Sequence, residues 1–216
     1  EMSASLVGSE MCIRDSNNVI RLRDITKVYH LGEIDLPVLK GITLDIKEGE
    51  FVSLTGASGS GKSTLMNILG CLDRPTSGHY YIAGEDVAKF NPAERAILRN
   101  KRIGFVFQSF YLLSRESALE NVALPLLYAG VKRQERLEIA RHALERVGLG
   151  DRTGFKPTQL SGGQCQRVAI ARAIVRKPDI LILDDSASAL DFATDARLRK
   201  AIREKTDGMT VFIVSQ

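Results

Sequence analysis

Hydrophobic and polar residues alternate along several short segments of this chain. Ile20–Tyr29 and Ile42–Ile46 carry apolar side chains at about every second position, as strands with one buried face do. Phe51–Thr55 is a more apolar run that ends at a glycine-rich loop, which predicts a buried strand. The remaining predicted strands are Ile103–Phe107, Ile180–Leu183 and Thr210–Val214.

Helical periodicity fills the intervals between these strands. The charged segment Lys132–Val147 places its apolar residues on one helical face, and Gly148 follows as a stop signal. Three other helices are predicted. One begins at Ser63, one runs from a cap at Ser161 to Val175, and one spans Thr194–Thr206. Alternating strands and helices favour an α/β fold, with a largely helical subdomain at about 109–176.

Composition narrows the class of protein. The chain has 216 residues, of which 44% are hydrophobic and 26% charged, as expected for one globular domain. Its net charge of +4 is spread along the chain, and we expect no nucleic-acid partner. No apolar run approaches the ~20 residues that a membrane-spanning helix needs, so any spans must lie elsewhere. The three cysteines lack metal-ligand spacing and indicate reduced thiols.

The first residues do not follow the pattern of the rest. Residues 5–16 resemble a translated sequencing adapter, and they lack the basic start and apolar core of a signal peptide. A natural disordered tail is the alternative. We therefore expect 1–17 to be a non-native or disordered leader, and 18–216 to be a domain truncated at its C-terminus.

A glycine-rich loop carries the clearest chemistry. Residues 56–63 match the pattern G-x-x-x-x-G-K-[ST], after a predicted strand and before a predicted helix. Glycines let backbone N–H groups point at phosphate oxygens, Lys62 reaches the β- and γ-phosphates, and the Ser63 hydroxyl binds Mg²⁺. A flexible Gly/Ser loop is the alternative. The predicted ATP-binding residues here are Gly56, Ala57, Ser58, Gly59, Ser60, Gly61, Lys62, Ser63 and Thr64.

A second motif selects one family among the proteins with such a loop. Leu160-Ser161-Gly162-Gly163-Gln164 resembles the signature motif of ATP-binding-cassette (ABC) ATPases, and Arg167–Ala173 continues the likeness. Ser161 and the glycines open a helix with exposed N–H groups, a second anion site, although a plain helix cap has the same residues. The resemblance implies a head-to-tail dimer, with ATP between the phosphate loop of one chain and Ser161, Gly162, Gly163 and Gln164 of the other.

The resemblance assigns further roles. Gln108 ends a strand like the glutamine that reaches Mg²⁺ and the attacking water in that family. Asp184 follows an apolar strand like the aspartate that holds Mg²⁺ through water, which makes Ser63, Gln108 and Asp184 the predicted metal residues. Tyr29 stands where the family places an aromatic ring on adenine, and a half-exposed strand tyrosine is the alternative. Residues 188–191 resemble the loop that crosses the dimer interface.

The end of the sequence departs from the nearest subfamily. As far as about residue 176 the chain resembles ATPases of the macrolide-exporter and lipoprotein-release type. From 180 to 216 it resembles the degenerate half of a heterodimeric exporter, with Asp185 in place of the catalytic glutamate and Gln216 in place of the histidine. Cys165 also replaces a polar residue after the signature. A natural degenerate ATPase and a chimera joined near residues 177–179 both explain the change.

The family implies an expected function. The resemblance implies an α/β P-loop NTPase of the ABC ATPase type, with a mixed sheet core, an antiparallel β subdomain and a helical signature subdomain. It also implies that the chain uses ATP and Mg²⁺, that its partners are transmembrane permease subunits and a second ATPase chain, and that it works on the cytoplasmic face of the membrane. Gln108, Asp185 and Gln216 are the predicted catalytic residues. A non-hydrolysing regulatory cassette and a non-transport ABC protein are the alternatives.

Overall fold

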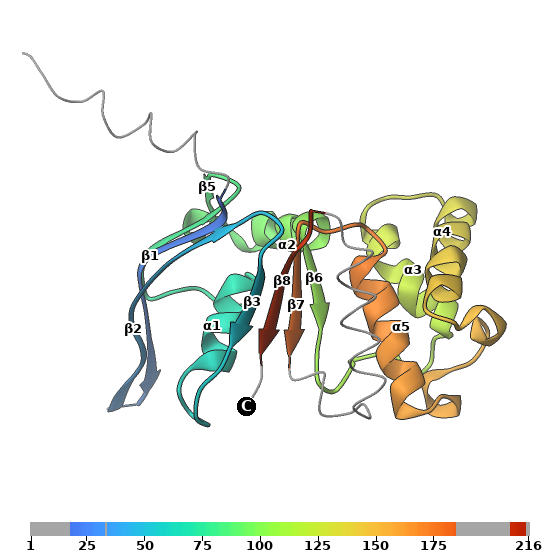
Figure 1. Cartoon of the computed structure of the whole chain (residues 1–216), viewed down its shortest axis with the longest axis horizontal. Helices are drawn as coiled ribbons and strands as arrows, with labels where there is room; N and C mark the ends of the chain where they lie inside the picture. The colour runs from blue at the N-terminus through green and yellow to red at the C-terminus, as the bar shows by residue number, and fades with distance from the viewer. Residues whose placement is uncertain (1–17, 33, 185–207, 215–216) are drawn as a thin grey trace, which may run out of the picture.

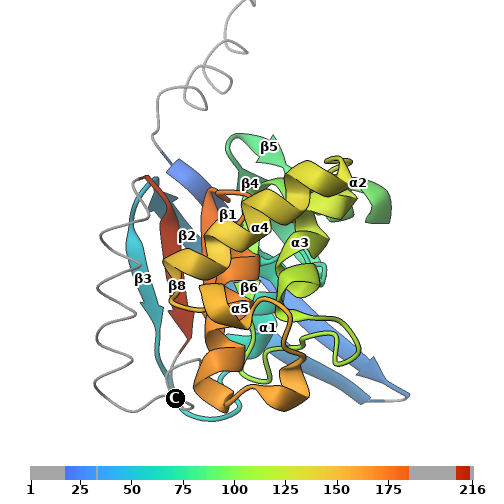
Figure 2. The same cartoon turned by 90° about the vertical axis from the view of Figure 1, so that its right-hand side faces the viewer.

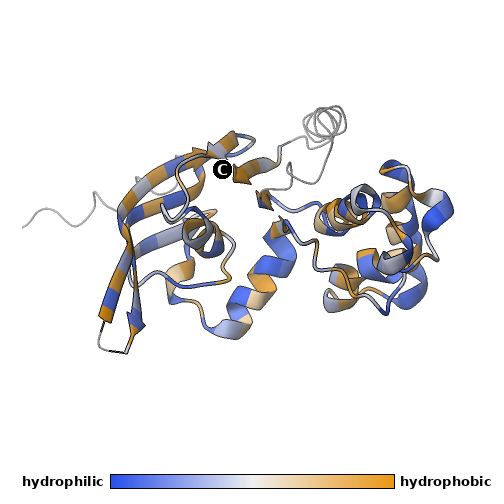
Figure 3. Cartoon of the chain, turned by 90° about the horizontal axis from the view of Figure 1, so that it is seen from below, coloured by the Kyte–Doolittle hydropathy of each residue, from blue (hydrophilic) through white to orange (hydrophobic). Residues whose placement is uncertain are grey.

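The computed structural model describes residues 18–32, 34–184 and 208–214. Figure 1 shows an antiparallel sheet at one end, a parallel sheet in the middle and a group of helices at the other end. The view from below in Figure 3 shows the same order, with hydrophobic and hydrophilic residues alternating along the strands. The predicted α/β architecture, with an antiparallel β part and a helical part, is therefore present.

The antiparallel sheet has the strand order β2-β1-β4-β5. Both strands predicted here are confirmed, and both are longer than the alternation indicated. The strand β2 includes Pro37, which breaks the apparent pattern but is tolerated because β2 lies at the edge of this sheet. The strands are β1 (Asn18–Leu31), β2 (Ile34–Lys47), β4 (Ser77–Ile82) and β5 (Glu85–Asp86).

The parallel sheet has the strand order β3-β8-β7-β6. Its strands are β3 (Phe51–Leu54), β6 (Ile103–Val106), β7 (Ile180–Asp184) and β8 (Thr210–Val214). The prediction that β3 is buried is wrong: Phe51 and Ser53 are exposed, and the residues between and after them are half-buried. Among the described strands β3 is the edge of the sheet, so only one of its faces meets the core.

Helices flank both sheets. Next to the β-strands are α1 (Lys62–Leu69) and α2 (Pro92–Arg102), with the 3-10 turn η1 (Val87–Lys89). At the far end are α3 (Ala118–Tyr128), α4 (Arg133–Arg146) and α5 (Gly162–Ile174), with the 3-10 turns η2 (Gly150–Arg152) and η3 (Pro157–Gln159). The helix predicted at 194–206 lies outside the described residues.

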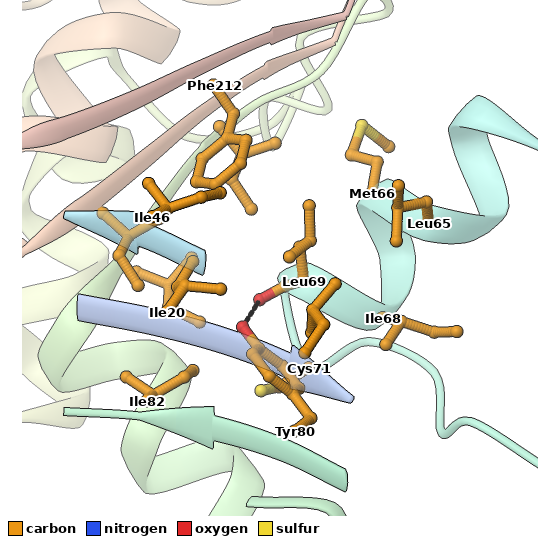
Figure 4. Close-up of a cluster of buried hydrophobic side chains, with 14 of the residues drawn as sticks. Ile20, Ile46, Leu65, Met66, Ile68, Leu69, Cys71, Tyr80, Ile82 and Phe212 are labelled. Carbon is orange, nitrogen blue, oxygen red and sulfur yellow. Dashed lines mark hydrogen bonds between the residues drawn. The ribbon is translucent and has the colours of Figure 1, made fainter. Parts of the chain in front are cut away.

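The main core joins the two sheets through α1. Figure 4 shows Ile20, Leu69, Tyr80 and Phe212 packed together, from both sheets and from α1. The Tyr80 hydroxyl donates a hydrogen bond of 2.6 Å to the Leu69 carbonyl, which satisfies the polar atom of a buried ring. Burial raises the pKa of the nearby Cys71 thiol to about 11, so this cysteine stays protonated at neutral pH.

The helices at the far end share a separate core. Figure 2 shows α3, α4 and α5 packed together in front of the sheets. The helix α4 contributes Ala140 and Leu144, both fully buried, with Leu137 and Val147 beside them. The helical face predicted for this segment is confirmed, whereas the division into subdomains stays a prediction. Of the helices described, none is both long and apolar enough to span a membrane.

Candidate nucleotide-binding site

The glycine-rich loop connects β3 to the first turn of α1. Gly61 is the N-cap residue of α1 and has a φ of 88°, in the left-handed region that favours glycine. A Cβ atom there would lie 3.0 Å from a Leu39 methyl group and 3.2 Å from the Val38 carbonyl oxygen. The loop thus depends on glycine for its conformation and for its close approach to β2.

The loop leaves the start of α1 open. No side chain caps this helix, whereas α2, α3 and α5 are capped by Asn91, Ser117 and Ser161. The Lys62 ammonium donates hydrogen bonds of 2.5 Å and 2.9 Å to the carbonyl oxygens of Gly56 and Ala57. A free helix N-terminus with a lysine held across it is an arrangement that suits a phosphate group.

A pocket of about 350 Å³ surrounds this loop. Gln108 and Asp184 line it together with the loop residues, although the three segments are far apart in sequence. They meet because β3, β6, β7 and β8 are parallel and their carboxyl ends share one edge of the sheet. The predicted residues in the lining are Ser58, Gly59, Gly61, Lys62, Ser63, Thr64, Gln108 and Asp184.

The side chains in this pocket fit Mg²⁺ and a nucleotide phosphate. Ser63, Gln108 and Asp184 offer a hydroxyl, an amide oxygen and a carboxylate, the oxygen donors that Mg²⁺ prefers. Within the described residues there is no cluster of three or more His, Cys, Asp or Glu that would hold a metal ion by itself. This donor set matches an ion that is shared with a phosphate and with water.

Tyr29 is not part of the lining of this pocket. Its hydroxyl donates a hydrogen bond of 3.2 Å to Asp73, and the Lys27 ammonium lies 4.9 Å from the centre of its ring. Tyr29 pairs across the sheet with Leu36, which lines a second pocket of about 470 Å³ on the other side of the loop. A base bound in that second pocket would be next to the strand that carries Tyr29.

The signature residues lie at the start of α5. The Ser161 hydroxyl accepts a hydrogen bond of 3.3 Å from the Gln164 N–H, and the Gln164 side chain accepts one of 2.8 Å from the Ser161 N–H. Neither of them, nor Gly162 or Gly163, lines the pocket of the phosphate loop. Figure 1 shows the start of α5 on the same lower edge of the molecule as that loop, beyond the parallel sheet.

Several predicted site residues lie outside the described part of the chain. These are Asp185, Gln216 and the interface loop at 188–191. Conversely, two residues that the sequence analysis did not predict, Val38 and Val214, line the pocket. Val214 ends β8 at the same edge as Asp184, so its place follows from strand order, which periodicity alone does not reveal.

Three comparisons with known proteins agree with this geometry. The family description "ABC transporter" matches residues 39–188. The chain is 53% identical over 202 residues to "Macrolide export ATP-binding/permease protein MacB" of Syntrophobacter fumaroxidans, an alignment that covers 92% of this chain and 28% of that protein. It is 50% identical to "Uncharacterized ABC transporter ATP-binding protein YknY" of Bacillus subtilis, over 91% of this chain and 86% of that protein.

The fold also matches solved structures. One is a dimeric, post-hydrolysis state of the ATP-binding cassette MJ0796 bound to ADP and Pi, with a TM-score of 0.83 and 44% identity. The structural alignment covers 91% of this chain and 88% of the cassette. The pocket, the loop and these likenesses lead to one conclusion: the chain belongs to the ABC transporter family, as an ATP-binding and ATP-hydrolysing domain that uses Mg²⁺.

Proposed function

We propose that this domain powers an export or lipoprotein-release system, as one of two ATPase chains that close on ATP beside a permease. The observation that supports this most directly is the pocket in which the phosphate loop, Gln108 and Asp184 meet. A permease partner is consistent with the name of the MacB relative, of which this chain spans 28%. We place the domain on the cytoplasmic face of the membrane, where ATP is available.

Each residue of the pocket has a distinct part in this proposal. Lys62 turns from the loop carbonyls to the β- and γ-phosphates and neutralises their charge. Ser63 and Asp184 hold Mg²⁺, and Gln108 orients the attacking water. When bound, Mg²⁺ would supply neutralisation of the phosphate charge. Opposite them, Ser161 and the glycines after it come from the second chain, and Tyr29 contacts the base.

The first experiment tests nucleotide binding. Lys62→Ala removes the cation of the loop, and we expect at least a tenfold weaker affinity for Mg·ATP, about the worth of one charge-assisted hydrogen bond. Lys89→Ala is the matched control, since Lys89 is an exposed lysine that pairs with Asp86 outside the pocket. Equilibrium dialysis gives both affinities. Equal binding by the Lys62 variant and the unmodified chain would contradict the proposed site.

A groove along β6 is where we place the permease. It has a volume of about 610 Å³ and is lined by apolar side chains, among them the exposed Ile97 and Tyr128. Arg99, Arg172 and Arg176 also line it, and the described part of the chain adds no acidic residue to this lining. Charge complementarity therefore favours an amphipathic permease segment that carries a carboxylate.

The catalytic strength of the site depends on residues beyond Asp184. We propose that Asp185 and Gln216 make hydrolysis slow while ATP binding remains, because binding depends on the phosphate loop. An aspartate is one methylene shorter than glutamate, and a misplacement of roughly an ångström can cost on the order of a hundredfold in rate. Glutamine also lacks the charge and the proton options of histidine.

Phosphate release at saturating Mg·ATP tests this second part. We expect Asp185→Glu to raise the rate in part, because the change at Gln216 remains. Asp185→Glu combined with Gln216→His should raise it by more than the product of the two single effects, since both residues serve the same phosphate and water. Turnover by the unmodified chain as fast as that of the double variant would show Asp185 to be an adequate catalytic residue.

A further inference from the structure

The end of β6 separates the groove from the nucleotide pocket. Phe107 lines the groove, and the next residue, Gln108, lines the pocket. The Phe107 ring stacks on Phe105 at 4.9 Å between ring centres and meets the edge of Tyr111 at 5.2 Å. A shift of the segment that follows Gln108 would therefore move side chains in both places.

This segment has an unusual backbone. Phe110 and Tyr111 have φ angles of 58° and 43°, in the left-handed region that costs a residue with a side chain roughly 1–2 kcal/mol. One side chain holds both residues there. The two terminal nitrogens of Arg172 donate hydrogen bonds of 2.7 Å each, one to the Tyr111 carbonyl and one to the Phe110 carbonyl.

Arg172 is built into the helix that begins at the signature motif. It lies on α5 about three turns, or roughly 16 Å, beyond Ser161. Its guanidinium is half-buried and forms none of the ion pairs of the described residues. Its partners are instead the two backbone carbonyls, and burial lowers the pKa of this guanidinium from its ordinary value.

We propose that Arg172 is a positioning residue for ATP hydrolysis. Arg172 couples α5 to Gln108 because it binds the carbonyl groups of both Phe110 and Tyr111. This inference rests on the proposed function of Gln108 at the nucleotide. Because α5 is a continuous helix, a displacement of its N-terminus by an opposing nucleotide reaches Arg172, and the two-pronged contact passes it to the segment after Gln108. Only a planar guanidinium offers two donors at the required spacing.

The test compares Arg172→Gln and Arg172→Lys with Arg167→Gln. Arg167 is a matched control: it is on the same helix and donates to backbone carbonyls, those of Val147 and Gly148, which follow α4 and not Gln108. We expect Arg172→Gln to lower kcat about tenfold with an unchanged affinity for ATP, as misplacement of a reacting group does. Arg172→Lys, whose single nitrogen replaces the two terminal nitrogens of arginine, should have a higher kcat than Arg172→Gln but a lower one than the unmodified chain. Arg167→Gln should leave kcat unchanged.

A double-mutant cycle distinguishes positioning from a general loss of structure. Arg172→Gln should have little further effect on kcat in a chain that already carries Gln108→Ala, because both changes act through the same side chain. Independent, multiplying effects would overturn the proposal. Failure of the proposed function appears differently, as equal ATP affinity with and without Lys62, so the two outcomes are separable.

Hydrogen exchange gives a readout that does not need turnover. In the unmodified chain and in Arg167→Gln, we expect Mg·ATP to slow amide exchange in the peptide that spans residues 108–113. In Arg172→Gln this protection should be absent, although ATP still binds. Equal protection in all three proteins would overturn the role of Arg172, whatever the hydrolysis rate.

Discussion

Tyr29 has one ring face already occupied. The Lys27 ammonium lies over it, and both residues contact Asp73. Burial opposes ionisation of Asp73, but the hydrogen bonds from Lys27 and from the Arg74 backbone outweigh it and lower the pKa of this carboxyl. The charged carboxylate thus accepts the hydrogen bond of the Tyr29 hydroxyl at neutral pH, and a base that stacks on this ring would need the face opposite Lys27.

Substitutions at Tyr29 separate the ring from its hydroxyl. If the ring stacks on adenine, Tyr29→Phe should bind Mg·ATP within about twofold of the unmodified chain, whereas Tyr29→Ala should lose about 1–3 kcal/mol, the worth of a base on an aromatic ring. Isothermal titration with ATP and with inorganic triphosphate checks this. The two substitutions should not differ for triphosphate, which has no base. A large loss for Tyr29→Phe would assign the effect to the hydrogen bond with Asp73.

At the scale of single elements, the start of α5 combines two roles. Ser161 caps the helix, and the same helix end carries the proposed anion site for a second chain. A cap needs only an acceptor, which aspartate also provides, whereas an anion site cannot tolerate a negative charge. Stability and assembly can therefore be changed independently at one position.

Ser161→Asp should keep the melting temperature and abolish ATP-driven dimer formation. Ser161→Ala should lower stability by about 1 kcal/mol, as loss of a helix cap does. Ser117→Asp is the control, because Ser117 caps α3 in the same way, by accepting from the Glu120 N–H at 3.2 Å. Thermal unfolding and light scattering with Mg·ATP measure both properties. A Ser161→Asp chain that still dimerises would exclude this helix end from the dimer contact.

The elements that the sequence predicted are those with a clear period or a clear cap. The strands β1, β6, β7 and β8 and the helices α4 and α5 belong to this group. The helix α3 lies within the stretch of about 109–176 that was predicted to be largely helical, but its bounds were not predicted, although Ser117 and Glu120 carry the spacing of a capping box. The helix α2 was missed despite Asn91, Pro92 and Glu94, the signal by which it could have been found.

The residues that line the nucleotide pocket were predictable where a sequence motif is specific to one kind of site. Six of the nine predicted loop residues line one pocket with Gln108 and Asp184, as strand ends of a parallel sheet should, whereas Gly56, Ala57 and Ser60 do not, and the roles assigned to these residues stay predictions. The contact between Arg172 and the segment after Gln108 left no sign in the sequence, because its acceptors are backbone carbonyls. Every residue type has such carbonyls, so only the folded chain reveals the pair.

Across the whole molecule, the apolar groove runs along β6, and the nucleotide pocket begins just past the end of the same strand, at Gln108. The groove has the aromatic and arginine side chains that are common at protein interfaces. Arg176 is anchored there by Asn100, and Arg99 by the carbonyl of Cys71, so both guanidinium groups are held in place. A fixed positive charge selects its partner through charge more than through area.

Reversal of charge in the groove should therefore prevent assembly. We expect Arg99→Glu to lose co-purification with the permease portion of the Syntrophobacter fumaroxidans relative, and to keep its affinity for Mg·ATP. Lys89→Glu reverses the charge of an exposed lysine that pairs with Asp86, and this variant should still co-purify with the permease portion. Retained binding by Arg99→Glu would mean that the permease segment is neutral at this place or docks elsewhere.

The strand order of the parallel sheet also has a consequence during synthesis. The strand β8 lies between β3 and β7, although both are made well before it. The two halves of the sheet therefore have no direct pairing until residues 210–214 have left the ribosome, and such distant pairing is slow to form. Val214 is also part of the pocket wall. A nascent chain consequently exposes unpaired strand edges to chaperones for most of its translation, and ATP can stabilise it only after that strand inserts.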